Sequence, residues 1–422
     1  MIPAADLVTI LIVATSILLM LVRPRNIPEV YWIGGGVFLL LILRLISLPL
    51  AGHATAKALD VCLFLVGMML VSELAREYGV FDWLSSVAVR SAHGSCSRLF
   101  ALIYGVGTLV TIFMSNDATA VVLTPAILTA VRKSKVKPLP YLFVCAFIAN
   151  AASFVLPISN PANLVVFHND LPPLGQWLLS FGLPSVFSIV TTFLVVRWIF
   201  RKQLCALIET ELEPHPLPPS GRLVLWGLAF MVAILLTASS LGKNLGLPAC
   251  LAALVLTAVI SVRNRSNPLH LAREISWETL ALVAGLFIMV DAVERIGALR
   301  LSQRWLDWAQ SLGPVTGVFT TGFAVAVANN LVNNLPLGLI AGSTLVASHA
   351  KGMIANSVLI AVDLGPNLSI TGSLATILWL LALRKEKLNV TFWDFFKVGA
   401  LAMPVALLAS LAAAIVVGMA RL

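Results

Sequence analysis

The stretch Ser115-Asn116-Asp117-Ala118-Thr119 lies in the middle of an apolar segment, about 99 to 131, that is too long for one membrane helix. Amide and carboxyl groups are costly at bilayer depth unless protein or a wet cavity surrounds them. A second apolar segment, about 314 to 348, carries Asn329-Asn330-Leu331-Val332-Asn333-Asn334-Leu335-Pro336 in the same position. Each segment is therefore predicted to be a re-entrant hairpin with its polar tip near the middle of the membrane.

The rest of the chain is equally apolar. Of its 422 residues, 59% are hydrophobic and 11% charged, whereas about a quarter are charged in a soluble domain. This composition excludes a soluble globular protein and predicts an all-α polytopic membrane protein in the lipid bilayer. In addition to the two hairpins, about ten transmembrane helices are expected, at about 5–22, 30–48, 58–75, 140–167, 176–200, 222–241, 248–262, 277–293, 353–383 and 397–420.

The positions of the Lys and Arg residues predict the orientation. Cytoplasmic loops carry an excess of these residues, which also explains the net charge of +9 without nucleic acid as a partner. With both termini outside, and each hairpin returning the chain to the side that it left, the inner loops hold 20 of the 28 Lys and Arg residues. If either hairpin were counted as a full span, the basic runs 132–137 and 197–202 would no longer lie on the same side of the membrane as the neighbouring basic loops.

The two halves of the chain resemble each other. Residues 201–221, rich in Glu and Pro, are predicted to be a cytoplasmic linker between a first repeat, 1–200, and a second repeat, 222–422. Asn116-Asp117 corresponds to Asn333-Asn334 at an offset of 217 residues. Because each half has five spans, an odd number, the second half is expected to be inverted relative to the first. Inverted repeats are typical of secondary transporters.

Polar residues also interrupt one predicted span in each half, 140–167 and 353–383. Pro and Gly in mid-span break a helix and free backbone groups, which can bind a small polar solute where the breaks face hairpin tips. The alternative is that these residues only pack or kink the helices, but the clusters recur at matched places in two repeats. The predicted substrate-binding residues are Asn116, Asp117, Asn150, Ser159, Asn160, Asn333, Asn334, Asp363, Thr371 and Ser373.

Asp117 and Asp363 are the only acids predicted deep in the membrane. Because burial disfavours the charged form of a carboxyl group, each can take up and release protons near neutral pH. They are the candidate proton carriers, and the alternative role is to cap the N terminus of a broken helix. By contrast, Glu73 lies near a span end beside Arg76 and is expected to form an interfacial ion pair.

Other kinds of site find no support in the sequence. It contains no HExxH, GxSxG, P-loop or GxGxxG motif, so neither an enzyme nor an ATP-driven pump is indicated. The five cysteines are scattered singly, which is not the pattern of a disulfide framework or a metal site. We expect no cofactor and no bound metal.

At these polar segments the chain resembles the arsenite and antimonite efflux permeases of the ArsB type, within the wider ion transporter superfamily. The similarity is most specific in Asp363-Leu364-Gly365-Pro366 and Gly372-Ser373-Leu374-Ala375-Thr376, where the family carries DLGP and GSLAT. Asn116-Asp117-Ala118 is similar to its NDGA, and Asn333-Asn334-Leu335-Pro336 to its NNMP. The similarity runs in order over nearly the whole chain.

The resemblance implies an inner-membrane carrier that expels trivalent arsenite or antimonite, driven by protons and in some systems associated with a cytoplasmic ATPase. It also implies that the solute lies between the hairpin tips and the broken helices. Two positions depart from the family pattern, since Asn150 stands in place of an Asp and Asn367 in place of a Lys. The two lost charges either compensate each other or change the coupling ion.

We therefore expect a proton-coupled exporter of arsenite and antimonite that works by alternating access. Arsenous acid is mainly neutral at pH 7, so Asn, Ser and Thr side chains can hold it without a cationic pocket. A sodium-coupled or anion carrier of the same superfamily is the first alternative, and sodium dependence would distinguish it. A passive metalloid channel is the second, and its flux would ignore the proton gradient.

Overall fold

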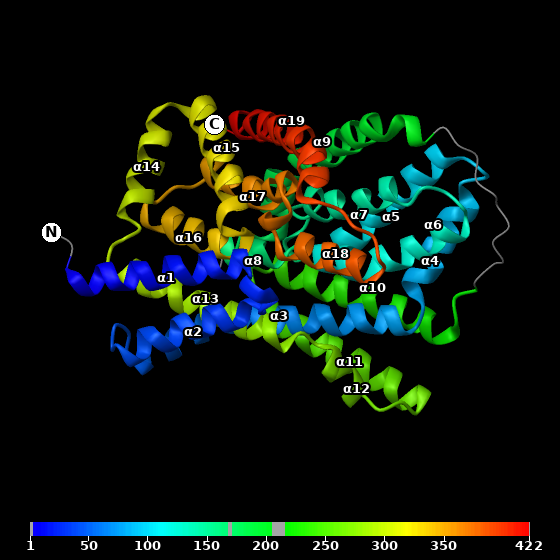
Figure 1. Ribbon diagram of the computed structural model, residues 1–422, viewed down its shortest axis with the longest axis horizontal. Coiled ribbons are helices and arrows are strands. Elements are labelled where there is room, and N and C mark those ends of the chain that lie inside the picture. The colour runs from blue at the N-terminus through cyan, green and yellow to red at the C-terminus, as the bar shows by residue number, and fades with distance from the viewer. Residues whose placement is uncertain (1–2, 168–170, 205–215, 422) are drawn as a thin grey trace.

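The computed structural model describes residues 3–167, 171–204 and 216–421, which form helices and connecting turns without a β-strand (Figure 1). Within these described residues, eight helices are long and apolar enough to cross a membrane. They are α1 (Ala4–Val22), α3 (Leu48–Glu77), α5 (Cys96–Phe113), α9 (Leu174–Phe200), α10 (Pro219–Ser240), α11 (Gly246–Asn264), α15 (Pro314–Val332) and α19 (Phe392–Met419). Large apolar side chains on these helices face outward, including Trp226 (76% exposed) and Val262 (80%). Lipid accounts for such exposure, which water would penalise.

The predicted all-helical, polytopic fold is confirmed, and six of the ten predicted spans are single long helices of this group. The remaining four differ in form. The predicted span 30–48 contains the 14-residue helix α2 (Glu29–Ile42), and 277–293 is α13 (Trp277–Arg295), whose second half carries Asp291 and Glu294. The spans 140–167 and 353–383 are each broken in the middle. The shorter elements are η1 (Pro24–Asn26), α4 (Val80–Ser91), η4 (Arg201–Gln203), α12 (Leu269–Glu274) and α14 (Arg300–Ser311).

The chain turns back on itself at both predicted hairpin tips. In the first, α5 is followed by a turn at 114–117, a π-helical segment η2 (Ala118–Leu123) and α6 (Thr124–Lys133). The Thr119 hydroxyl lies 2.8 Å from that of Thr111 and 3.5 Å from the carbonyl oxygen of Gly107, so η2 folds back against the end of α5. In the second, α15 and α16 (Asn334–Ala347) meet at Asn333, which has a φ of +80°.

The first broken span consists of α7 (Leu139–Ala151), η3 (Pro157–Ser159) and α8 (Pro161–Val166). Because α7 ends at Ala151 and Pro157 has no backbone N–H, the carbonyl oxygen of Ser153 lies beyond the helix without a backbone donor. The fully buried Asn163 donates from its Nδ2 to that oxygen at 2.8 Å, and also to the carbonyl oxygen of Leu156 at 3.2 Å. A side-chain amide therefore takes the place of the missing backbone donor.

The second broken span repeats this solution. It consists of α17 (Met353–Leu364), η5 (Gly365–Leu368), η6 (Ile370–Gly372) and α18 (Leu374–Lys385). Pro366 leaves the carbonyl oxygen of Val362 without its backbone donor. The buried Asn329 of α15 donates from its Nδ2 to this oxygen at 2.6 Å, and Asn330 donates to the carbonyl oxygen of Gly365 at 3.0 Å. Residues of the second hairpin thus stabilise the break in the following span.

The helices pack in two groups (Figure 1). Helices α1, α2, α3, α10, α11 and α13 pack against one another in the lower part of the view, and α3 approaches α11 so closely that a Cβ on Gly67 would lie 2.6 Å from the backbone of Ala249. Helices α5, α7, α9, α15, α17 and α19 pack together above them. Of the predicted linker 201–221, residues 205–215 lie outside the described part of the chain.

The pairing of Asn329 with Val362 predicts a stability effect. Replacing Asn329 by Leu keeps a branched side chain with the same number of heavy atoms but leaves a buried carbonyl oxygen unpaired, which costs about 1–3 kcal/mol. We expect Asn329→Leu to lower the thermal unfolding midpoint of the solubilised protein. The matched control is Asn244→Leu, because Asn244 is exposed. Equal midpoints for the two variants would contradict this role of Asn329.

Candidate functional site

The two broken spans contact each other through two pairs of buried side chains, each joining the first half of the chain to the second. Asn160 donates from its Nδ2 to Asp363 Oδ1 at 2.8 Å, and Asn150 donates from its Nδ2 to Asn367 Oδ1 at 3.0 Å. None of the four residues is more than 2% exposed. The partners are more than 200 residues apart in the sequence, so the fold alone brings them together.

The pair Asn150–Asn367 involves the two positions that depart from the ArsB-type pattern. Asn150 also donates to Thr376 Oγ1 at 3.3 Å, and Asn367 donates from its Nδ2 to the carbonyl oxygen of Phe147 at 3.0 Å. Because the two amides are in direct contact, the charges lost here would have formed one ion pair. This geometry favours the alternative in which the two lost charges compensate each other, and it disfavours a change of coupling ion.

Asp363 lies at the end of α17 and is fully buried. Its Oδ1 accepts the hydrogen bond from Asn160, while its Oδ2 has no hydrogen-bond partner among the described residues. No Lys or Arg in the described part of the chain forms an ion pair with it. A carboxylate at this depth without a cation is costly, so a proton is a suitable counter-charge.

Asp117, the second predicted proton carrier, lines a cavity of about 150 Å³ at the first hairpin tip. Pro161 and Leu374, the first residues of α8 and α18, line the same cavity. These two half-helices are capped by Asn160, which accepts from the backbone N–H of Ala162 at 3.0 Å, and by Ser373, which accepts from that of Thr376 at 3.3 Å. The cavity is therefore bounded by one hairpin tip and the N-terminal ends of both broken spans.

The titratable groups that line this cavity are all acidic. Besides Asp117 they are Glu73 of α3 and Glu274 of α12, and no Lys, Arg or His is among the described lining residues. Ser72, Ser115, Ser276 and Thr279 supply hydroxyl groups, and the remaining wall is apolar. Such a cavity suits a small neutral solute that can form hydrogen bonds, and it opposes an anion.

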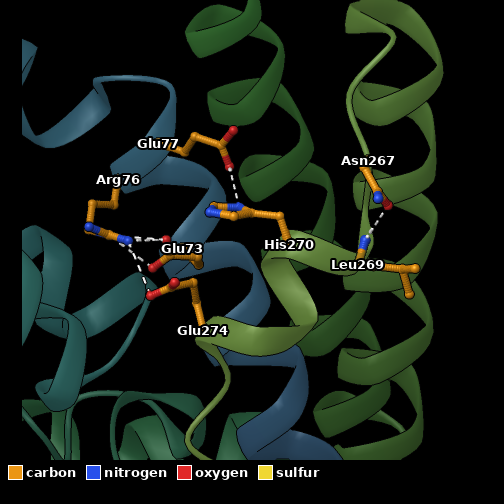
Figure 2. A network of polar contacts seen from close by, with 7 residues as sticks. All are labelled: Glu73, Arg76, Glu77, Asn267, Leu269, His270 and Glu274. Carbon is orange, nitrogen blue, oxygen red and sulfur yellow. Dashed lines mark hydrogen bonds and ion pairs between the residues drawn. The ribbon is translucent and has the colours of Figure 1, made fainter.

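The expected ion pair between Glu73 and Arg76 is present. Arg76 also reaches Glu274 of α12, while Glu77 on the next turn of α3 lies 4.0 Å from His270 (Figure 2). Glu274 is 201 residues from Glu73, and no spacing in the sequence pointed to it. Asn163, Asn329 and Asn330 were also missed as residues that stabilise the breaks, although each lies within the Asn-rich segments that surround the prolines.

The second hairpin tip is more tightly packed than the first. Asn333 lines a crevice of only about 10 Å³, which is about the space for one water molecule. Its Nδ2 donates to the carbonyl oxygen of Thr371 at 3.1 Å, and the Thr371 hydroxyl donates to the carbonyl oxygen of Asn330 at 2.9 Å. Asn334 is buried, and its Oδ1 has no partner among the described residues.

Of the ten predicted binding residues, Asp117 alone lines the cavity at the first hairpin tip. Asn116 is buried, and its Oδ1 accepts from the backbone N–H of Asp117 at 2.9 Å. Ser159 donates to the carbonyl oxygen of Ile112 at 2.9 Å, which ties the first broken span to the first hairpin. The structure thus separates Asp117, at the cavity, from a buried polar region that contains Asn150, Asn160 and Asp363.

Comparison with known proteins shows which family the chain resembles. A family model described as a citrate transporter matches residues 4–365. Arsenical pump membrane proteins of Escherichia coli and Yersinia enterocolitica are each 28% identical over 348 residues, 79% of this chain and 81% of theirs. A putative arsenical pump membrane protein of Bacillus subtilis is 22% identical over 418 residues, 92% of this chain and 94% of its own.

The crystal structure of the Alcanivorax borkumensis YdaH transporter has a similar fold. It matches with a TM-score of 0.59 and 14% identity, covering 87% of this chain and 86% of that one. At this identity the likeness concerns the fold alone. Together these matches confirm the resemblance to the ArsB-type permeases and the fold of a multi-pass membrane transporter.

The contact between Asn150 and Asn367 can be tested by replacing the two amides with oppositely charged side chains. Asn150→Asp and Asn367→Lys each bury one uncompensated charge and should lower the thermal unfolding midpoint. The double variant places opposite charges at hydrogen-bond distance and should recover most of the loss, with a coupling energy of about 1–3 kcal/mol in the double-mutant cycle. A double variant as unstable as the sum of the single changes would show that the two positions are not in contact.

Proposed function

The chain belongs to the citrate transporter family, and we propose that it is a secondary transporter that exports trivalent arsenite and antimonite from the cytoplasm in exchange for protons. Relatives named as arsenical pump membrane proteins, which match about four-fifths of the chain, support this substrate. The proposed site is the cavity at the first hairpin tip, and alternating access would open it to each side of the membrane in turn.

The observation that carries the proposal is the acidic lining of this cavity. Arsenous acid is small, mainly neutral at pH 7, and has three hydroxyl groups that can donate to Asp117 and to the serine hydroxyls. A citrate anion would bring further carboxylates to a cavity lined by Asp117, Glu73 and Glu274. Like charges in a poorly solvated site are strongly unfavourable. The lining thus favours a neutral solute over the anion in the family's description.

Protons would be exchanged at two carboxyl groups with different roles. Asp117 meets the solute directly, so that a proton and a solute hydroxyl compete for the same carboxylate. Asp363 would act indirectly, through its hydrogen-bond partner Asn160, which caps α8 at the wall of the cavity. A change in the charge of Asp363 would alter the Asn160 hydrogen bond and with it the N terminus of α8. This arrangement would couple the proton on Asp363 to the solute.

The further parts of the proposal concern location and partners. We place the protein in the inner membrane with both termini outside and the basic run 132–137 in the cytoplasm. Arg132 in this run pairs with Glu386 after α18 at 2.7 Å, which brings two basic segments together. This face, with the linker 201–221, is where a cytoplasmic ATPase subunit would dock. A sodium-coupled carrier and a passive channel remain the competing functions.

Transport by variants in everted membrane vesicles tests the roles of the two carboxyl groups. We expect Asp117→Asn and Asp363→Asn each to reduce arsenite accumulation driven by an imposed proton gradient by about tenfold or more, because neither amide can exchange a proton. Asp307→Asn is the matched control, since Asp307 is exposed on α14. Replacement of sodium should change none of the rates. If both variants kept full proton-driven accumulation, the assignment would fail.

A further inference from the structure

The mouth of the Asp117 cavity holds a cluster of charges that joins α3 to α12. Glu73 and Glu274 line the cavity, and both bind Arg76, which is not among the lining residues. The Nε of Arg76 donates to Glu73 Oε1 at 3.1 Å and Oε2 at 2.9 Å, and its Nη2 lies 3.6 Å from Glu274 Oε2. Figure 2 shows the guanidinium beside both carboxylates, which lie next to each other and face it from the same side.

The exposure of these side chains shows which of them lies towards the cavity and which towards solvent. The side chain of Glu73 is 14% exposed, whereas those of Arg76 and Glu274 are 52% and 44% exposed. This end of the cavity therefore reaches solvent, with one carboxylate on the inner side and the guanidinium on the outer side. Glu77, which faces His270 on the neighbouring turn of α12, adds a third carboxylate (Figure 2). In this network three carboxylates face one guanidinium and one imidazole, so its net charge is negative whether or not the imidazole carries a proton.

We propose that Glu73 and Glu274 act as an anion filter at the cavity mouth. They occupy the Arg76 guanidinium and leave a net negative charge, so that neutral solutes reach Asp117 while oxyanions and carboxylate anions are rejected. This inference rests on the proposed function, because it concerns the substrate class of the same cavity. It makes Glu73 and Glu274 specificity-determining residues.

The chemistry of arginine explains why the filter needs two carboxylates. A free guanidinium offers a planar set of donors that binds carboxylates and oxyanions in bidentate fashion. Arg76 without its partners would be such a receptor at the entrance of a cavity. With Glu73 and Glu274 in place, an incoming anion would have to displace a carboxylate and would meet the others. Repulsion of this kind is a common way to obtain specificity.

Anion binding to the purified full chain tests the filter. Citrate, and in parallel arsenate, is titrated into wild type, into Glu73→Gln/Glu274→Gln and into the triple variant that also carries Arg76→Gln, at constant ionic strength. We expect the double variant to bind citrate about tenfold or more tightly than wild type, because Arg76 is released. The triple variant should lose this gain. Asp82→Asn/Asp307→Asn, which removes two exposed carboxylates on α4 and α14, is the matched control and should resemble wild type.

The proposal is overturned if the double variant binds citrate no better than wild type, if the triple variant keeps the gain, or if the control variant shows the same gain. Should the double variant not fold, Glu274→Gln alone changes only a half-exposed residue and is expected to give a smaller gain with the same dependence on Arg76. The readout does not require transport. A failure of the proposed function would appear instead as a wild-type protein that moves no arsenite.

Discussion

The structure depends on how it pairs the backbone carbonyl oxygens that two prolines leave free inside the membrane. Pro157 and Pro366 lie at the breaks of their spans, and an unpaired carbonyl in the apolar interior would be costly. Asn163 and Asn329 pair the oxygens of Ser153 and Val362. Because these amides pair the free carbonyl oxygens, α8 and α18 can begin inside the protein with their N-terminal ends at a cavity.

The second consequence of the breaks is contact between the two halves of the chain. Asn150 binds Asn367, and Asn160 binds Asp363, where the broken spans pack together. Asn160 also caps α8, so one side chain links a buried carboxyl group to the wall of the cavity. The first hairpin tip completes the site by adding Asp117. Packing, hydrogen bonding and the proposed proton exchange therefore involve the same few residues.

Much of this could be predicted from the sequence because polar residues are conspicuous in an apolar chain. The tips at Asn116-Asp117 and Asn333-Asn334, and the breaks near Pro161 and Pro366, are local features, and the structure has turns or breaks at each. The pairing of Asn150 with Asn367 could not be read from the chain, since nothing local joins residues 217 positions apart. The same holds for Glu274, whose place at the cavity is set by the packing of α12 on α3. For the nine predicted binding residues other than Asp117, which do not line the cavity, a binding role stays a prediction.

The central claim is that a neutral trihydroxy solute and protons exchange at an acidic cavity. The most direct test uses purified protein in liposomes that contain a pH-sensitive dye and no ion gradient other than one of arsenite. We expect the arsenite gradient alone to drive protons in the opposite direction, with or without sodium, while a citrate gradient drives none. Arsenite movement without proton movement, or proton movement that requires sodium or follows citrate, would contradict the account.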